Sequence, residues 1–261
     1  MSRSAPRPAT ARRWLRLNEY GWARKALLVL AALVGSVALA YGANLARRNA
    51  LWQVLRVCML DQTTTGSPAP CLEVDLSHGP DKGFAVLRPP FGEPDTILTP
   101  TRPIAGLEDP KLAADDLPNY FALAWSARHW VGDAGAGDRI ALAVNSRMAR
   151  SQDQLHVHIG CLTPSFASTL HGGALGPRAR VWFRAPDMAP GLELWTYRSG
   201  GKDLSDFDPI RLARGLVAAP SELRRMTVAL VQTKTEFVAA ALRSRPGGWY
   251  ASADDVLDAR C

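Results

Sequence analysis

The chain has 261 residues, of which 47% are hydrophobic, and a formal net charge of +7 at pH 7. It is long enough for one sizeable core, and it contains no low-complexity run, no internal repeat and no glycine-rich phosphate loop. The charge is unevenly placed, because residues 1–25 hold seven basic residues and one acidic residue, Glu19. A basic tail alone is typical of a nucleic-acid-binding arm, but the segment that follows indicates a different partner.

An uncharged apolar segment follows the basic tail. Residues 26–43 read ALLVLAALVGSVALAYGA, and residues 44–46 extend the segment up to Arg47 and Arg48. A bilayer core of about 30 Å requires about 20 apolar residues as helix, whereas a cleaved signal peptide usually has an apolar region of about 7–15 residues. A buried helix of a soluble protein would carry a polar face, which this segment lacks. We therefore expect residues 26–46 to form a transmembrane anchor, with a cleaved signal sequence as the alternative.

The flanking charges set the expected orientation of this anchor. More basic residues precede the apolar segment than directly follow it, and basic flanks stay on the cytoplasmic side. We expect a single-pass protein of the inner membrane, with residues 1–25 in the cytoplasm and a domain of residues 50–261 in the periplasm. The lipid bilayer is then the expected partner, and no nucleic acid is expected.

The four cysteines are even in number, as expected for disulfides in an exported domain. Cys58 and Cys71 flank a short Thr-, Gly-, Ser- and Pro-rich segment, so we expect them to pair, which leaves Cys161 to pair with Cys261. The second bond would close a long loop, which contributes roughly 3–5 kcal/mol in the chain-entropy description. Zinc ligation is the rival interpretation, but the sequence has no Cys-x-x-Cys pair.

Secondary structure is predicted most clearly in the first half of the exported domain. Residues 49–60 have the spacing of a short amphipathic helix, and a loop follows. Two strands joined by a turn are expected over 83–89 and 95–101. A helix is expected over 119–132, with Asn119 as its N-cap and a glycine as its stop, and then a strand over 139–145.

The second half is less regular. The sequence favours strands near residues 181–186 and 192–199, and a helix that begins at Pro209 with Asp208 as its cap. Residues 226–243 are typical of a hairpin. Taken with the first half, the pattern predicts an α+β fold, in which helices pack on a meandering antiparallel sheet.

Residues 154–162 are the most informative part of the chain. They are expected to form a strand, and successive side chains of a strand point to opposite faces. Gln154, His156 and His158 would then share one face, while the apolar residues between them face a core. Imidazole titrates near neutral pH and serves as nucleophile, acid–base group or metal ligand. We place the candidate site here, and a purely structural histidine pair is the alternative.

The loop of residues 145–153 precedes this strand and is dense in hydrogen-bond donors. It includes Asn145, Arg147, Arg150 and Ser151. Because a guanidinium matches the geometry of phosphate oxygens, we count these residues as candidate substrate-binding groups. The plain alternative is that both arginines are solvated. The other three histidines are expected in surface or structural roles: His78, His129 and His171.

Three segments around this strand resemble a known family. They are TILTPTRPIAGLEDP (96–110), PNYFALAWSAR (118–128) and ALAVNSRMARSQDQLHVHIGCLTP (141–164), and the four cysteines and the single span also fit. The chain is similar to the bacterial CDP-diacylglycerol pyrophosphatases, a branch of the histidine-triad-like superfamily, whose motif is three histidines alternating with apolar residues on a strand. The resemblance implies a histidine-triad-like antiparallel sheet with packed helices.

The resemblance also implies a reaction. The pyrophosphate of CDP-diacylglycerol would be hydrolysed to CMP and phosphatidate, with no metal and no cofactor required. His156 matches the family's nucleophile, which would form a nucleotidyl-histidine, and His158 matches the last histidine of the motif. Gln154 stands where the family usually has its first histidine. An amide still forms hydrogen bonds, but it cannot carry a charge or a proton.

Other residues of the loop acquire roles from the same resemblance. Asn145 and Ser151 match the polar groups that hold the phosphate and the leaving group, and Arg147 would stabilise charge on the phosphoryl oxygens together with His158. Two other interpretations stay open from the sequence. One is a related hydrolase or transferase that acts on another nucleotide-linked substrate, and the other is a non-catalytic exported domain in which the motif has decayed.

Overall fold

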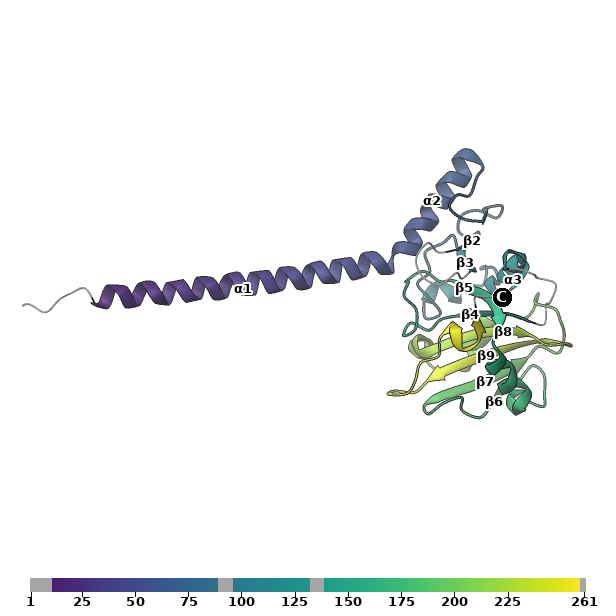
Figure 1. Cartoon of the computed structure of the whole chain (residues 1–261). Coiled ribbons are helices and arrows are strands. Elements are labelled where there is room, and N and C mark those ends of the chain that lie inside the picture. Colours follow the sequence, from purple (N-terminus) through teal and green to yellow (C-terminus); the bar gives the residue numbers. More distant parts are fainter. Residues whose placement is uncertain (1–10, 89–95, 132–138, 259–261) are drawn as a thin grey trace, which may run out of the picture. The chain divides into compact units, whose positions relative to one another are not determined.

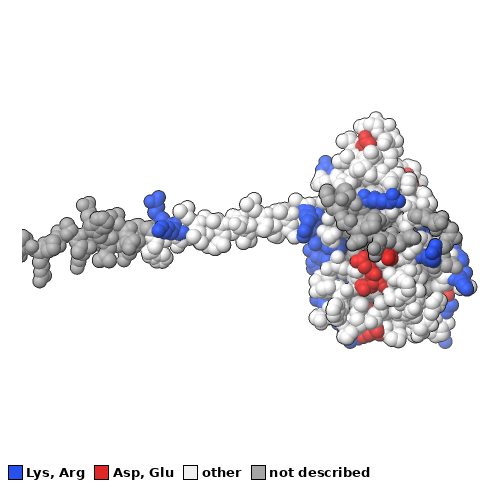
Figure 2. All heavy atoms as spheres, viewed as in Figure 1, with Lys and Arg blue, Asp and Glu red and all other residues white. Residues whose placement is uncertain are grey.

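The computed structural model describes residues 11–88, 96–131 and 139–258 (Figure 1). The chain divides into two compact units, and the boundary lies between Arg47 and Arg48. The first unit consists of most of helix α1 (Ala11–Arg48). Within the described residues, one helical stretch, Arg24–Arg48, is long and apolar enough to cross a membrane, with a mean hydropathy of 2.2. Figure 2 shows no charged group between its two basic ends.

The second unit is built on one ten-stranded sheet in which every pairing of strands is antiparallel. The strand order is β1-β2-β3-β5-β4-β8-β9-β7-β6, and β10 pairs with β5. The α+β prediction is therefore confirmed. The strands are β1 (Glu73–Asp75), β2 (Phe84–Leu87), β3 (Thr96–Pro100), β4 (Ile140–Val144), β5 (Val157–Leu162), β6 (Trp182–Arg184), β7 (Leu192–Arg198), β8 (Met226–Gln232), β9 (Phe237–Ser244) and β10 (Leu257–Asp258).

The sheet departs from a simple meander, because several neighbouring strands are not consecutive in the chain. Strand β5 lies between β3 and β4, and β9 lies between β8 and β7 (Figure 1). One edge of β5 pairs along its length with β4, while its other edge is shared by β3 at the start and β10 at the end. His158 thus lies in a central strand, where ladders hold the backbone on both sides.

Helices cover both faces of the sheet. On one face, α3 (Tyr120–Ser126) and α5 (Pro209–Leu216) pack in the main core against apolar residues of β4, β5 and β8. On the other face, α2 (Ala50–Thr65) packs against β2 and β3. Further along that face, α4 (Pro164–Thr169) and the segment 251–257 pack against β4 and β8.

Cross-strand pairing shows where His158 lies in this arrangement. Directly opposed residues of an antiparallel ladder share one face of the sheet. His158 is opposed by Ile97 of β3 and by Ala143 of β4. Ile97 belongs to the cluster under α2, whereas Ala143 belongs to the cluster under α4. His158 therefore lies on the second face, at the place where these two apolar clusters meet.

Local sequence signals explain several helix ends. The side chain of Asn119 accepts hydrogen bonds from Phe121 and Ala122 at the start of α3, and Asp208 caps α5 in the same way, so both predicted N-caps are confirmed. Helix α3 is shorter than predicted, because it tightens into the 3-10 turn η2 (Ala127–Trp130). The glycine predicted to stop it lies outside the described residues, as does the turn between β2 and β3.

Helix α2 is longer than the predicted 49–60. It continues to Thr65 and ends at Gly66, whose φ of 76° places it in the left-handed region. The Cys58–Cys71 disulfide is confirmed, with a Cα–Cα distance of 5.7 Å, and it ties α2 to the segment before β1. Cys161 is also disulfide-bonded. Its predicted partner, Cys261, lies outside the described residues, so that pairing stays a prediction.

Candidate active site

The strand that carries the histidines begins later than predicted. Strand β5 starts at Val157, and residues 154–156 form an extended lead-in to it. The backbone N–H of Leu155 donates to the carbonyl of Ile104 (2.6 Å), which lies in a loop and not in the ladder of β3. The alternation of side chains survives this difference, because Leu155, Val157 and Ile159 are all buried in the main core. Only the start of the predicted strand is wrong.

His156 is buried and is held in one tautomer. The residue is 7% exposed, and its Nδ1 lies 2.7 Å from the backbone carbonyl of Gln154. A carbonyl oxygen only accepts hydrogen bonds, so Nδ1 carries the proton and donates it. In the neutral ring the lone pair is then on Nε2. This is the tautomer that a nucleophilic imidazole needs.

His158 is oriented by an asparagine that is itself fixed by the backbone. The N–H of Ala253 donates to Oδ1 of Asn145 (2.7 Å), which identifies the other end of that side chain as the NH2 group. This Nδ2 lies 3.2 Å from Nε2 of His158 and donates to it. The rings of His156 and His158 meet edge to face, with centroids 4.8 Å apart. The structure thus brings both predicted catalytic histidines together.

Gln154 does not present its amide to the two histidines. Its side chain is buried, with the residue 1% exposed, and its Nε2 donates to the carbonyls of Pro100 (2.9 Å) and Arg102 (3.0 Å). It also lies 3.3 Å from the hydroxyl of Thr99. The side chain therefore fastens the lead-in of β5 to the end of β3. Next to the histidines, Gln154 instead offers its backbone carbonyl, which accepts the hydrogen bond from Nδ1 of His156.

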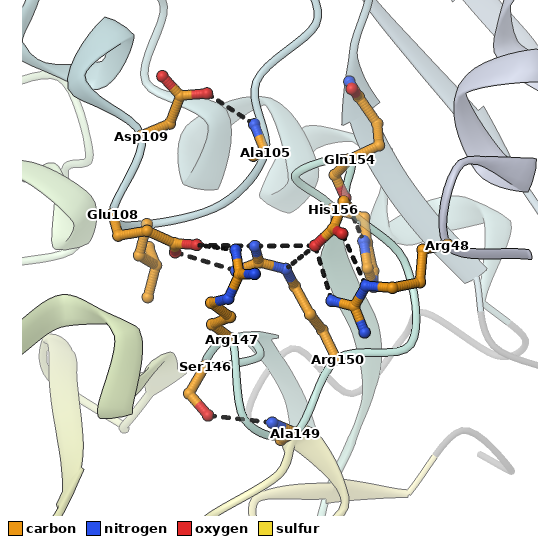
Figure 3. Close-up of polar contacts among 12 residues, drawn as sticks. Arg48, Ala105, Glu108, Asp109, Ser146, Arg147, Ala149, Arg150, Gln154 and His156 are labelled. Atoms are coloured by element: carbon orange, nitrogen blue, oxygen red, sulfur yellow. Dashed lines mark hydrogen bonds and ion pairs between the residues drawn. The ribbon is translucent and has the colours of Figure 1, made fainter. Parts of the chain in front are cut away.

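Arg150 lies in a charged cluster, shown in Figure 3, and not on an open surface. Its side chain is 2% exposed. The guanidinium donates two hydrogen bonds to Glu108 (2.9 and 2.7 Å) and also contacts Asp153 (3.1 Å). Asp153 in turn receives two hydrogen bonds from Arg48 (2.6 and 2.7 Å). We infer that Arg150 supports the loop, because its donors are already engaged by protein carboxylates.

The carboxylates of this cluster are held in their ionised form. Hydrogen bonds from Arg48 lower the pKa of Asp153 to about 2, against the opposing effect of burial. Burial is the largest single effect on Glu108 and raises its pKa, but the hydrogen bonds to its carboxylate and the charges of Arg150 and Arg147 together lower that pKa. The cluster is therefore charged at neutral pH, and each buried ion has a partner.

Arg147 and Ser151 are the two exposed members of the predicted substrate-binding set. The side chain of Arg147 is 42% exposed, and its contact with Glu108 is long, at 3.8 Å. Ser151 is also exposed. Both lie in the loop that joins Asn145 to the lead-in of β5, and their polar ends are accessible to solvent.

Several residues of the site were not anticipated from the sequence. Glu108 and Asp153 hold Arg150, Arg48 holds Asp153, and Ala253 fixes Asn145. The sequence offered a weak indication of Glu108 and Asp153, since each is a charged residue within one of the segments that resemble the family, 96–110 and 141–164. Arg48 and Ala253 are far from the site in sequence. The remaining histidines are exposed and lie on other segments of the chain: His78, His129 and His171.

Comparisons with known proteins identify the family. Residues 46–261 match the family described as CDP-diacylglycerol pyrophosphatase. The chain is also similar to a CDP-diacylglycerol pyrophosphatase of Yersinia pestis, with 34% identity over 215 residues that cover 80% of this chain and 81% of the relative. The match spans the whole sheet-containing unit, including both histidines and the charged cluster. This chain therefore belongs to the CDP-diacylglycerol pyrophosphatase family.

Proposed function

We propose that this protein hydrolyses the pyrophosphate of CDP-diacylglycerol to CMP and phosphatidate, with His156 as the nucleophile. Family membership over residues 46–261 supports the substrate and the reaction. The observation that carries the residue assignment is the 2.7 Å hydrogen bond from His156 Nδ1 to the Gln154 carbonyl. It holds the ring in the tautomer in which Nε2 can attack phosphorus.

The proposed reaction has two steps. Nε2 of His156 attacks the phosphorus on the nucleotide side, the bond to the bridging oxygen breaks, and phosphatidate leaves. Water then attacks the nucleotidyl-histidine and releases CMP, which restores the imidazole. Splitting the hydrolysis in this way replaces one difficult displacement with two easier ones. We further propose that the lead-in and β5 form a histidine-triad-like arrangement in which Gln154 takes the first position.

The polar residues around His156 would stabilise negative charge on the phosphoryl oxygens. We propose that His158, Arg147 and Ser151 contact the phosphoryl oxygens, since His158 adjoins the nucleophile and the other two are exposed. Asn145 fixes the orientation of His158 and would therefore act on the substrate only through that histidine.

A membrane anchor over α1 suits this substrate, because the lipid chains stay in the bilayer while the headgroup reaches the site. We propose that this membrane is the inner membrane and that the sheet-containing unit is periplasmic.

The test uses the full-length protein in detergent micelles. We expect release of CMP from CDP-diacylglycerol and little release from soluble nucleotide sugars or dinucleotides. With substrate labelled in the nucleotide phosphate, an alkaline quench should recover label on the protein, because phosphorus–nitrogen bonds survive alkali. His156→Ala should abolish both signals, and His158→Ala should reduce turnover. His171→Ala is the matched control, because His171 is exposed and lies in the segment Leu170–Ala174, outside β5 and its lead-in.

Each alternative has its own outcome in this experiment. Preferred turnover of a soluble nucleotide would indicate a related enzyme with another substrate. The absence of turnover and of labelled histidine with every substrate would indicate a non-catalytic domain. Full activity in His156→Ala would reject His156 as the nucleophile.

A further inference from the structure

Arg48 joins the end of helix α1 to the loop that precedes the histidines. It is the last residue of α1, yet it belongs to the sheet-containing unit. Its Nε and Nη2 donate to the two oxygens of Asp153 (2.6 and 2.7 Å), and its carbonyl accepts from the N–H of Asp153 (2.7 Å). Three hydrogen bonds between two residues 105 positions apart fix the position of Asp153 in both side chain and backbone.

A second pair of residues reinforces this junction. Asn49 precedes α2 but forms no capping hydrogen bond with its side chain. Instead, Oε1 of Gln152 accepts from the N–H of Leu51 (2.9 Å) in the first turn of α2. Such first-turn N–H groups have no partner within the helix, so the loop caps α2 from outside. Residues 152 and 153 are thus both bound to the segment 48–51.

The position of Asp153 bears directly on the proposed nucleophile. Asp153 is followed by Gln154, whose carbonyl accepts the Nδ1 proton of His156. The Gln154 side chain is fixed on its other side by the carbonyls of Pro100 and Arg102. The carbonyl that orients His156 is therefore held between β3 and the Arg48–Asp153 pair. Displacement of a catalytic group by about 1 Å can lower turnover by about 100-fold.

We propose that Arg48 is a positioning residue for His156, acting through Asp153 and the Gln154 carbonyl. This inference rests on the proposed role of His156 as nucleophile. It means that the catalytic unit begins at Arg48, so the residue that ends the apolar helix also supports the active site. Arginine suits this position, because its planar fork matches both carboxylate oxygens, whereas a lysine offers a single charged point.

Arg47 supplies a matched control for this proposal. It has the same side chain, it lies next to Arg48, and it is exposed, whereas Arg48 is partly buried. Replacing either residue removes the same charge from the same end of the apolar helix. Effects on membrane insertion or on attraction to a charged lipid headgroup should therefore be shared by Arg47→Ala and Arg48→Ala. An effect on the alignment of His156 should occur only in Arg48→Ala.

The experiment compares full-length variants in micelles that contain CDP-diacylglycerol. We expect Arg48→Ala to lower kcat by about tenfold or more while KM changes by less than about twofold, as for loss of alignment. Arg48→Lys should restore part of kcat, and Arg47→Ala should match the wild type. Asp153→Asn should resemble Arg48→Ala, and the double variant should be no slower than the slower single variant. A thermal melt of each variant separates loss of alignment from loss of fold.

A second measurement does not depend on turnover. In protein labelled with ¹⁵N-histidine, the Nδ1–H signal of His156, identified by its absence in His156→Ala, should shift or broaden in Arg48→Ala and stay unchanged in Arg47→Ala. Equal kcat for the two alanine variants, or a rise in KM alone, would overturn the proposal. An inactive wild type would reject the proposed function, whereas the histidine signal would still decide whether Arg48 positions His156.

Discussion

Gln154 occupies the position at which the family's motif usually has a histidine, and its side chain has a structural role in this chain. The buried amide donates to two backbone carbonyls at the end of β3. From the alternation of residues we expected Gln154, His156 and His158 to share one face beside the substrate. The structure separates the first from the other two, because the Gln154 amide reaches acceptors that the sequence did not reveal.

Gln154→Ala should therefore lower stability. The substitution leaves the carbonyls of Pro100 and Arg102 without this donor, at a cost of about 1–3 kcal/mol of unfolding free energy. Gln154→His restores the family pattern and should keep activity equal or higher. Denaturant unfolding measures the stability of each variant, and kcat measures its activity. Gln53→Ala is the control, because Gln53 is exposed on α2. A large loss of kcat in Gln154→Ala with unchanged stability would instead indicate a direct catalytic role.

The Asp153 carboxylate should make stability depend on pH in the acid range. Its pKa in the folded protein is about 2, lowered chiefly by the hydrogen bonds of Arg48, while an unfolded aspartate titrates near 3.9. The folded state then binds fewer protons, so its stabilisation is present above about pH 4 and is lost as the pH falls towards 2. Asp153→Asn should flatten this part of the stability profile, whereas Asp81→Asn, in an exposed position, should not. Equal slopes in the wild type and Asp153→Asn would contradict the assignment.

Strand β5 is the element on which the site depends, and a glycine allows its pairing with the chain's last strand. A Cβ on Gly160 would lie 2.5 Å from the carbonyl oxygen of Asp258 in β10. That contact is with backbone, so it cannot be relieved by turning a side chain. Gly160 thus permits β10 to lie close to the second half of β5, beyond the end of β3.

Gly160→Ala should displace β10 and destabilise the unit by about 1–3 kcal/mol, as for other steric insertions into packed structure. Gly215→Ala is a useful contrast. Gly215 lies in α5 with no atom within 4 Å of an added Cβ, so alanine there should stabilise by about 0.5–1 kcal/mol. Hydrogen exchange of the β10 amides together with the unfolding midpoint measures both effects. Unchanged β10 protection in Gly160→Ala would refute the argument.

Elements encoded by local sequence were largely predictable. The caps at Asn119 and Asp208, the hairpin of β8 and β9 and the short disulfide loop all follow from residues close together in the chain. The strand order did not follow, because insertion of β5 between β3 and β4 depends on contacts across the whole fold. The same limit applies to the site. The pairs Arg48–Asp153 and Asn145–Ala253 are 105 and 108 residues apart, and no local pattern joins them.

The molecule as a whole combines one long apolar helix with a catalytic unit that starts at the end of that helix. Charge and hydropathy predict a domain that starts at residue 50, whereas the compact unit of the structure begins at Arg48. The difference of two residues matters, because Arg48 belongs both to the helix and to the cluster beside the histidines. A membrane-bound enzyme of this design would hold its active site at a short distance along the chain from the bilayer.

The orientation of the whole chain can be tested directly. The basic residues before the apolar helix should keep residues 1–25 in the cytoplasm, so that the sheet-containing unit is exported. Alkaline phosphatase fused after Gly66, where α2 ends, should be active, and β-galactosidase at the same point should be inactive. A phosphatase fusion within the basic tail should be inactive and serves as the control.

An N-terminal tag that stays in the membrane fraction with the activity would indicate an uncleaved anchor, since removal of a signal sequence would separate the tag from the active domain. The reverse pattern of reporter activities would overturn the orientation and, with it, the formation of the disulfides in an oxidising compartment.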